Sequence, residues 1–319
     1  MRILATALAN PRPKTASSTL DLQLGLPLGS VERVGGVKFR YLADKHTLQS
    51  ELAAEALSNA AARAGVRLGS LDLILSASAL PEQALPNTAS AILRQLDFPG
   101  ASAFDINSSC LSFLTAMRVA GNFLQTRTYH RIGIVACDLA SRGLDWSTAE
   151  ASYIFGDGAA AVILEAGGGG AIEAFSQRTY PEGFGHCQIK AGGSRLSDSA
   201  TLSDMKFSMD GRGVFKLAAK VLPEVVEDTL TKAELGLDDI EVFVPHQASH
   251  LGLQHMVKRL GLPQGKTIDI YANNGNQVAA SLPTALNDAF ERGLLVKDSR
   301  VMLLGTAAGL TAGCMVVRV

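Results

Sequence analysis

The run Ser70-Leu71-Asp72-Leu73-Ile74-Leu75 has the same pattern as Asp239-Ile240-Glu241-Val242-Phe243-Val244: one polar, one apolar, one acidic and then three apolar residues. From residue 70 to residue 239 the shift is 169 residues. Arg131-Ile132-Gly133-Ile134-Val135 matches Arg300-Val301-Met302-Leu303-Leu304 at the same shift. Two strand-like matches at one offset predict an internal duplication, although any two buried strands look somewhat alike and a chance match is the alternative.

The predicted repeats are residues 1–165 and 171–319, with the glycine run at residues 167–170 where the first would end. Each half alternates apolar strand patterns with helical ones, which favours an α/β fold. The helical stretches Thr47–Ala64 and Val214–Leu235 are rich in Ala and Leu, as expected of helices buried against sheets. Gly65 and Gly236 follow them and suit helix C-termini.

Composition excludes several classes of protein. With 47% hydrophobic and 18% charged residues among 319, disorder is not expected. A net charge of −1 gives no global reason to expect nucleic acid or an anionic membrane as partner. The N-terminus shows no signal-peptide pattern, and Val301–Val317 predicts strand, turn and strand rather than a membrane helix. We therefore expect a soluble, cytoplasmic protein.

The four cysteines are widely spaced, with no CxxC pair, which fits neither a zinc site nor a disulfide framework. Cys110 is distinctive because an apolar strand ends at Asn107, and a helical pattern begins with Leu111. A cysteine at a helix N-terminus is expected to ionise more readily than the ordinary thiol, with its pKa of ~8.5. From position alone, a nucleophile and an inert buried cysteine are equally good interpretations.

His246 and Asn276 complete a candidate constellation. His246 follows the apolar strand that ends at Pro245, and Asn276 lies on a Gly-containing turn. The 169-residue shift maps Asn276 onto Asn107, three residues before Cys110, so the two turns are predicted to meet at the centre. An imidazole and an amide can both donate hydrogen bonds to one carbonyl oxygen and so stabilise an enolate. Singly, such a His or Asn is usually structural.

Five segments together resemble β-ketoacyl-acyl carrier protein synthase III, in the right order and across nearly the whole chain. They are Asp105–Phe113, Phe155–Ala160, Met209–Lys216, Val244–Ser249 and Gly275–Pro283. The resemblance implies a five-layer αβαβα thiolase fold with two pseudo-symmetric halves, a homodimer, and a catalytic triad of Cys110, His246 and Asn276.

The resemblance also implies a mechanism. Cys110 accepts an acyl group from acyl-CoA or an acyl carrier protein, while the backbone N–H groups of Cys110 and Gly309 hold the oxyanion. A malonyl thioester then loses carbon dioxide, His246 and Asn276 stabilise the enolate, and the enolate carbon attacks the acyl group. No metal or redox cofactor is required.

The chain departs from the family pattern around the substrate. The closing turn, usually Gly-Gly-Gly-Phe-Thr-Trp-Gly, reads Ala307-Ala308-Gly309-Leu310-Thr311-Ala312-Gly313. Ser30 and Ala149 stand near the positions of the Trp and Arg that sandwich adenine in members that use acetyl-CoA. Leu85 replaces a Phe that reaches into the partner's acyl pocket. Smaller side chains at Leu85, Leu310 and Ala312 predict an acyl pocket for a primer longer than acetyl.

Four basic residues lie at or near family positions that receive the acidic carrier protein: Arg212, Lys216, Lys258 and Arg259. They are predicted to dock it, although most charge clusters are simply solvated helix faces.

Other classes of protein compete with this interpretation. His246-Gln247-Ala248-Ser249-His250 has the spacing of a His-Glu-x-x-His metallohydrolase motif, but an amide at Gln247 cannot act as a general base. Cys, His and Asn also occur in this order in papain-like hydrolases, whose local signature is absent here, and a non-catalytic scaffold would not keep all three residues. Within the family, non-decarboxylative condensation and acyl transfer to an alcohol or amine are the alternatives.

Overall fold

Two β-sheets organise the chain, and each runs through the same sequence of strand pairings. The computed structural model describes residues 1–195 and 199–319. The first sheet has the order β1-β7-β6-β4-β5 and the second has β8-β13-β12-β11. Strands of the first sheet are β1 (Arg2–Ala9), β4 (Leu73–Ser76), β5 (Ser102–Asp105), β6 (Arg131–Asp138) and β7 (Gly158–Glu165). Those of the second are β8 (Ala171–Thr179), β11 (Val242–Pro245), β12 (Arg300–Ala307) and β13 (Thr311–Arg318).

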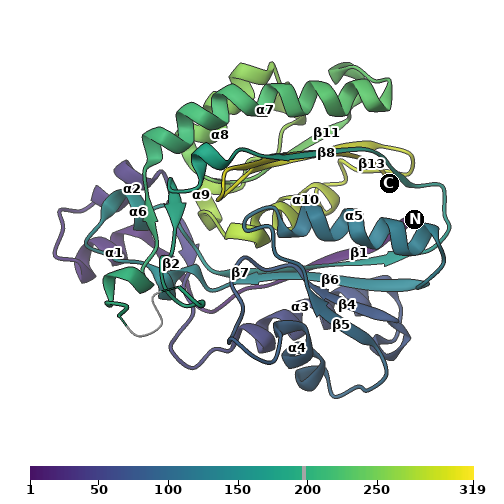
Figure 1. Ribbon diagram of the computed structural model, residues 1–319, viewed down its shortest axis with the longest axis horizontal. Helices are drawn as coiled ribbons and strands as arrows, with labels where there is room; N and C mark the ends of the chain where they lie inside the picture. The colour runs from purple at the N-terminus through teal and green to yellow at the C-terminus, as the bar shows by residue number, and fades with distance from the viewer. Residues whose placement is uncertain (196–198) are drawn as a thin grey trace.

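Helices form three layers around these sheets, which confirms the predicted αβαβα architecture (Figure 1). The middle layer, between the sheets, consists of α5 (Ser112–Gln125) and α10 (Ser281–Glu291). The outer face of the first sheet is covered by α3 (Gln49–Ala64) and α4 (Thr88–Leu96). The outer face of the second sheet is covered by α7 (Gly211–Ala233) and α8 (His250–Leu260). Shorter elements surround the site: β2 (Lys14–Ala16), β3 (Phe39–Tyr41), β9 (Cys187–Gln188), β10 (Ser208–Met209), α1 (Ser17–Gln23), α2 (Ser30–Gly35), α6 (Ala149–Ser152) and α9 (Tyr271–Asn274).

The central helix layer has apolar residues on both of its faces because each face meets a sheet. In α10, Leu282, Ala285, Leu286 and Ala289 are fully buried, in one cluster with Phe113 of α5 and with residues of both sheets. Two further clusters lie between α3 and the first sheet and between α7, α8 and the second. The Ala- and Leu-rich patterns of these helices thus follow from their burial.

The 169-residue shift reappears in the structure. From residue 73 to 242, β4 corresponds to β11, and from residue 131 to 300, β6 corresponds to β12. In both halves this strand pair is parallel, and the two following pairings are antiparallel. The boundaries 1–165 and 171–319 remain a prediction, but the equivalent strands show that two pseudo-symmetric sheets form the core.

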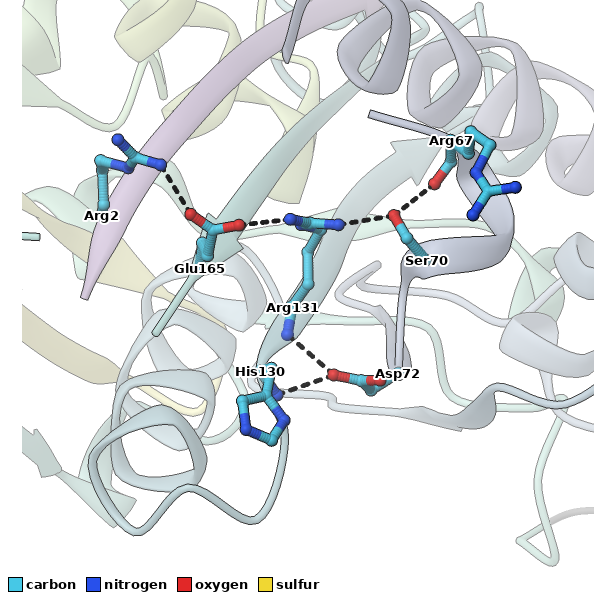
Figure 2. Close-up of polar contacts among 7 residues, drawn as sticks. All are labelled: Arg2, Arg67, Ser70, Asp72, His130, Arg131 and Glu165. Carbon is cyan, nitrogen blue, oxygen red and sulfur yellow. Dashed lines mark hydrogen bonds and ion pairs between the residues drawn. The ribbon is translucent and has the colours of Figure 1, made fainter. Parts of the chain in front are cut away.

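A polar network fixes the start of β6 against its neighbours, at the end of the sheet away from Asp138 (Figure 2). Arg131 bonds Glu165, and its other terminal nitrogen donates to the Ser70 hydroxyl at 2.7 Å. Asp72 accepts the backbone N–H of Arg131 at 2.9 Å. The second sheet repeats this contact, since the backbone N–H of Arg300 donates to Glu241 at 2.6 Å.

The ends of two long helices test the glycine predictions. Gly65 adopts a left-handed conformation with φ of 66° directly after α3, as predicted. The prediction for Gly236 was wrong, because α7 ends at Ala233 and Glu234 takes the left-handed position with φ of 57°. The strand, turn and strand predicted within Val301–Val317 is confirmed by β12 and β13. Across the described residues, every helix is too short or too polar to cross a membrane.

Candidate active site

A cavity of about 2000 Å³ opens at the carboxyl ends of β4, β6, β11 and β12. Cys110, His246 and Asn276 all line it, so the structure brings the three predicted residues together from both halves. Most of the surrounding wall is apolar. A mostly apolar cavity with a few convergent polar groups is the usual form of a site for a small organic substrate.

Cys110 lies on the turn between β5 and α5, with part of its surface open to the cavity. The helix begins only at Ser112, so Cys110 precedes its first turn. Burial raises the pKa of the Cys110 thiol to about 12, and the charge of Asp138 adds to this, while backbone N–H groups of Cys110 and Ala308 act in the opposite direction. Desolvation of the thiolate therefore opposes the predicted effect of the helix start, and the pKa of Cys110 lies above its ordinary value.

His246 follows β11 directly, and its backbone N–H donates to Leu304 of β12 at 2.8 Å. Gly305 lets the imidazole fit, since a Cβ there would lie 2.5 Å from the His246 Cβ. Only 4% of His246 is exposed, and among the described residues no group bonds its Nδ1. Burial lowers its pKa to about 4, so the imidazole is neutral at physiological pH.

Asn276 and Asn107 occupy equivalent turns, as the shift predicted. The Asn276 side-chain oxygen accepts the N–H of Val278 at 2.8 Å, and that of Asn107 accepts the N–H of Ser109 at 2.9 Å. Val278 and Ser109 both have left-handed backbones, with φ of 54° and 52°. For the β-branched Val278 this is a strained conformation, of the kind that concentrates at functional sites.

Asn276 makes one further contact through its amide nitrogen and two through its backbone. Its Nδ2 donates to the carbonyl of Ala248 at 3.1 Å, which leaves its second hydrogen for another acceptor. The backbone N–H of Asn276 donates to Ile154 at 2.8 Å, and its carbonyl accepts from Gly156 at 3.1 Å. A Cβ at Gly156 would lie 2.2 Å from the Asn274 carbonyl oxygen. The glycine allows this segment of the first half to hold the turn of the second.

Comparison with known proteins identifies the family of the chain. Residues 104–181 match the family model for 3-oxoacyl-[acyl-carrier-protein (ACP)] synthase III, and residues 230–319 match the model for its C-terminal part. The β-ketoacyl-[acyl-carrier-protein] synthase III of Natranaerobius thermophilus is 32% identical, over 99% of this chain and 98% of that protein. The chain belongs to the β-ketoacyl-[acyl-carrier-protein] synthase III family.

Further relatives place the fold. The enzyme of the same name from Synechocystis sp. is 34% identical, over 89% of this chain and 87% of that protein. A crystal structure of 3-oxoacyl-(acyl carrier protein) synthase III from Pseudomonas aeruginosa PAO1 superposes with a TM-score of 0.89 at 28% identity, covering 99% of this chain and 97% of that one. The five-layer architecture is thus the thiolase fold, and the family is one of condensing enzymes of the acyltransferase class.

The closing turn lies beside the Cys110 sulfur. Gly309, predicted as the second oxyanion donor, lines the cavity, and its role stays a prediction. The N–H group that acts on the Cys110 sulfur itself belongs to Ala308, one residue earlier. The strand β12 ends at Ala307, so Ala308 is the first residue whose N–H is released from the sheet toward the cavity.

The three predicted acyl-pocket residues lie in different surroundings. Leu310 lines the cavity and is 2% exposed. Ala312 is fully buried in the cluster beneath α7, and the cavity wall does not include it. Leu85 is 86% exposed and lies outside the cavity. Among these three, only Leu310 contacts the cavity within a single chain.

The four predicted docking residues gather at one edge of the cavity. Arg212 and Lys216 lie on the first turns of α7, and Lys258 and Arg259 lie at the end of α8. All four are exposed and all border the cavity. The structure therefore places this basic cluster (Arg212, Lys216, Lys258 and Arg259) at an entrance.

The metallohydrolase interpretation does not fit the local backbone. His246 directly follows β11 and α8 begins only at His250, so the two imidazoles do not share a helix face. The Gln247 amide is buried and donates to the carbonyl of Pro245 at 2.8 Å. Gln247 therefore has a structural role, and in the described parts of the chain three or more metal-binding side chains nowhere form a cluster.

Sequence reasoning missed other polar groups of the cavity. Asp138 ends β6 and is 3% exposed on the cavity wall. His186 pairs with Asp210 at 3.3 Å, beside a second thiol, Cys187. For Asp138 the only available signal was an acidic residue closing an otherwise apolar strand.

The buried neutral His246 gives a pH-dependent stability. Its folded pKa of about 4 lies below the ordinary ~6.5, so its contribution is complete above pH ~6.5 and is lost as the pH falls toward 4. Between about pH 7.5 and about pH 5, the wild type should lose ~2 kcal/mol more unfolding free energy than His246→Gln. Urea unfolding at the two pH values measures this.

Titration of Asp138 does not affect the difference in unfolding free energy between wild type and His246→Gln. Burial raises the pKa of its carboxyl to about 7, which changes stability in the opposite direction, but both proteins carry it. Equal losses in wild type and His246→Gln would mean that His246 is not buried in its neutral form.

Proposed function

We propose that this chain is a β-ketoacyl-acyl carrier protein synthase III-type condensing enzyme, in which Cys110 carries an acyl group and His246 and Asn276 drive decarboxylative condensation. The supporting observation is that these three residues, contributed by both halves of a chain of this family, line one cavity. The neutral state of His246 and the oriented amide of Asn276 suit the hydrogen-bonding role.

In the first half-reaction the Cys110 sulfur attacks the carbonyl carbon of an acyl thioester, and the bond to the carrier sulfur breaks. The free thiol is protonated, since its pKa is about 12, so its proton must be removed as it attacks. Neutral His246 can accept that proton and return it to the departing carrier thiol. The N–H groups of Cys110 and Ala308 would stabilise the oxyanion.

In the second half-reaction a malonyl thioester loses carbon dioxide, and the electron pair of the broken carbon–carbon bond forms an enolate. His246 and Asn276 each donate one hydrogen bond to the enolate oxygen. The enolate carbon attacks the acyl carbonyl on Cys110, the carbon–sulfur bond breaks, and Cys110 regains a proton. The product is a β-ketoacyl thioester.

The primer is proposed to be longer than acetyl. A cavity of about 2000 Å³ exceeds the ~300–1,000 Å³ of usual small-molecule sites, although the carrier's arm must share it. Its wall includes Leu144, Ile189 and Phe207, so an alkyl chain would meet apolar side chains.

The proposal extends to partners and location. The chain would use acyl carrier protein or acyl-CoA and malonyl thioester as substrates, without a metal or redox cofactor, in the cytoplasm. We also propose a homodimer, since Leu85 presents an apolar side chain that is 86% exposed in the single chain. Neither nucleic acid nor a membrane is expected as a partner.

Intact-protein mass spectrometry tests this function. Wild type is mixed with acyl thioesters from acetyl to decanoyl, carried by coenzyme A and by acyl carrier protein in turn, and malonyl carrier is then added. We expect a mass gain on the enzyme, faster from octanoyl than from acetyl, that disappears with malonyl carrier as a β-ketoacyl product forms.

Three other results would contradict parts of this proposal. Faster transfer from acetyl would overturn the long primer. An adduct that persists with malonyl carrier and discharges to an alcohol or amine would make the protein an acyltransferase of another kind. Failure of every donor to acylate the enzyme would remove the condensing function altogether.

Charge reversal tests the basic cluster. Lys216→Glu combined with Lys258→Glu should raise KM for carrier-borne substrates about fivefold or more, because the carrier is acidic, and leave a small thioester unaffected. Lys45→Glu with Lys297→Glu makes the same charge change at exposed positions outside the cavity. Equal changes with both substrates would show that the cluster does not dock the carrier.

A further inference from the structure

One buried carboxylate connects the two halves of the site. Asp138 is the last residue of β6, is 3% exposed and lies on the cavity wall. It accepts the backbone N–H groups of Ala79 at 3.0 Å, Leu80 at 3.3 Å and Ala279 at 3.0 Å. The first two donors belong to the first half, and Ala279 follows the Asn276 turn of the second.

On its first-half side, Asp138 holds the segment that supports the Cys110 turn. The side-chain nitrogen of Asn107 donates to the carbonyl of Ala79 at 2.9 Å. The Ser112 hydroxyl at the start of α5 lies 2.7 Å from the carbonyl oxygen of Ser109 and 3.2 Å from that of Ser78, so its one hydrogen is shared between the Cys110 turn and residue 78. Because these contacts come from both ends of the Cys110 turn, movement of residues 78–80 would move Cys110.

On its second-half side, Asp138 holds the short helical turn Val278–Ala280. Ala279 follows the strained Val278, whose N–H is bonded to the Asn276 side chain. At the position equivalent to Asp138, where β12 ends, the second half has Ala307. Only the first half therefore supplies a carboxylate that connects the two turns.

We propose that Asp138 is a positioning residue, whose carboxylate holds the Asn276 turn against the Cys110 turn so that the enolate forms beside the acyl carbonyl. The inference rests on the proposed condensing function. Two reacting groups on separate turns must be aligned closely, and a displacement of about 1 Å can cost about 10²-fold in rate. Burial raises the pKa of Asp138 to about 7, so above that pH it is a carboxylate with three N–H donors, whose charge-assisted hydrogen bonds suit it to such alignment.

The charge of Asp138 gives a second readout. It raises the pKa of the Cys110 thiol, after burial itself. The other ionisable groups that face Asp138 are Asp157, whose charge raises the pKa of Asp138, and Cys137, whose pKa Asp138 raises. Removing the charge should therefore shift alkylation of Cys110 by iodoacetamide to lower pH.

Asp138→Asn is the principal test. An amide has one acceptor oxygen, so it cannot satisfy both the Ala79–Leu80 side and Ala279. Malonyl-thioester decarboxylation should fall about 10–100-fold, in line with the loss of a hydrogen bond to a charged group. Hydrogen exchange at the Ala279 N–H should accelerate, and the pH midpoint of Cys110 alkylation should decrease.

Asp21→Asn is the matched control. Asp21 is also buried, and it accepts the N–H groups of Gly29 at 2.7 Å and Val31 at 2.8 Å, which lie outside the cavity and belong to neither turn. It should lower the melting temperature comparably, with decarboxylation and Ala279 exchange close to wild type. Equal losses of decarboxylation in the two variants, or a wild-type rate in Asp138→Asn, would overturn the positioning role.

Two further experiments apply if wild type is inactive or if the variant does not fold. If wild type itself does not decarboxylate malonyl thioester, the proposed function fails, and the positioning role is still decided by Ala279 exchange and Cys110 alkylation. If Asp138→Asn does not fold, Ala279→Pro removes the N–H donor and leaves the carboxylate with its other partners. Unchanged decarboxylation in that variant would contradict the proposal.

Discussion

Replacing Cys110 with alanine is expected to abolish the acyl-enzyme and to lower turnover at least about a thousandfold. The estimate is conservative, because removing the covalent nucleophile of a well-studied hydrolase costs about 10⁶-fold. Among the four cysteines, only Cys110 and Cys187 line the cavity. Mass spectrometry of the variant with the acyl donor preferred by wild type measures the adduct, and steady-state assays measure the turnover.

The same variant should still release carbon dioxide from malonyl thioester. His246 and Asn276 stabilise the enolate without the sulfur, so loss of Cys110 removes the acceptor and not the decarboxylation. Cys187→Ala is the informative comparison, since it removes the second thiol of the same cavity. An adduct that survives in Cys110→Ala and vanishes in Cys187→Ala would reassign the nucleophile.

The repeated architecture could be predicted because its signal is local. A strand that is buried on both sides must be apolar over several consecutive residues. The strands at Leu73–Leu75 and Val242–Val244 can therefore be recognised from the sequence without tertiary information. The 169-residue shift they share then maps Asn276 onto Asn107. The matching hydrogen bonds of both side chains to left-handed residues confirm that correspondence.

The ionisation of Cys110 could not be predicted in the same way. Its position before a helix suggested a stabilised thiolate, whereas the pKa depends on how much protein surrounds the sulfur and on a charge at Asp138. The sequence likewise did not show whether the N–H of Ala308 or that of Gly309 acts on the Cys110 sulfur, because a motif match at a turn is not precise to one residue. Asp138 escaped notice because its partner Ala279 is 141 residues away along the chain.

Asn276→Ala is expected to lower malonyl-thioester decarboxylation by about 10²–10³-fold, the usual effect of removing one donor from an oxyanion site. Acylation of Cys110 should be much less affected, because its proposed oxyanion donors are backbone N–H groups, those of Cys110 and Ala308. The variant also loses the contact to the N–H of Val278, so some stability should be lost. Carbon dioxide release and single-turnover acylation are measured separately on the same protein.

Asn107→Ala separates the chemistry of Asn276 from the support of its turn. It removes the equivalent hydrogen bond, 2.9 Å long, from the equivalent left-handed turn, at a side chain that is exposed, whereas that of Asn276 is buried. Asn107 lies on the Cys110 side, so its loss should disturb acylation more than decarboxylation, the reverse of Asn276→Ala. If both variants lowered the two half-reactions in the same proportion, Asn276 would be a turn residue only. Opposite patterns can arise only if the two halves of this duplicated fold have divided the chemistry between them.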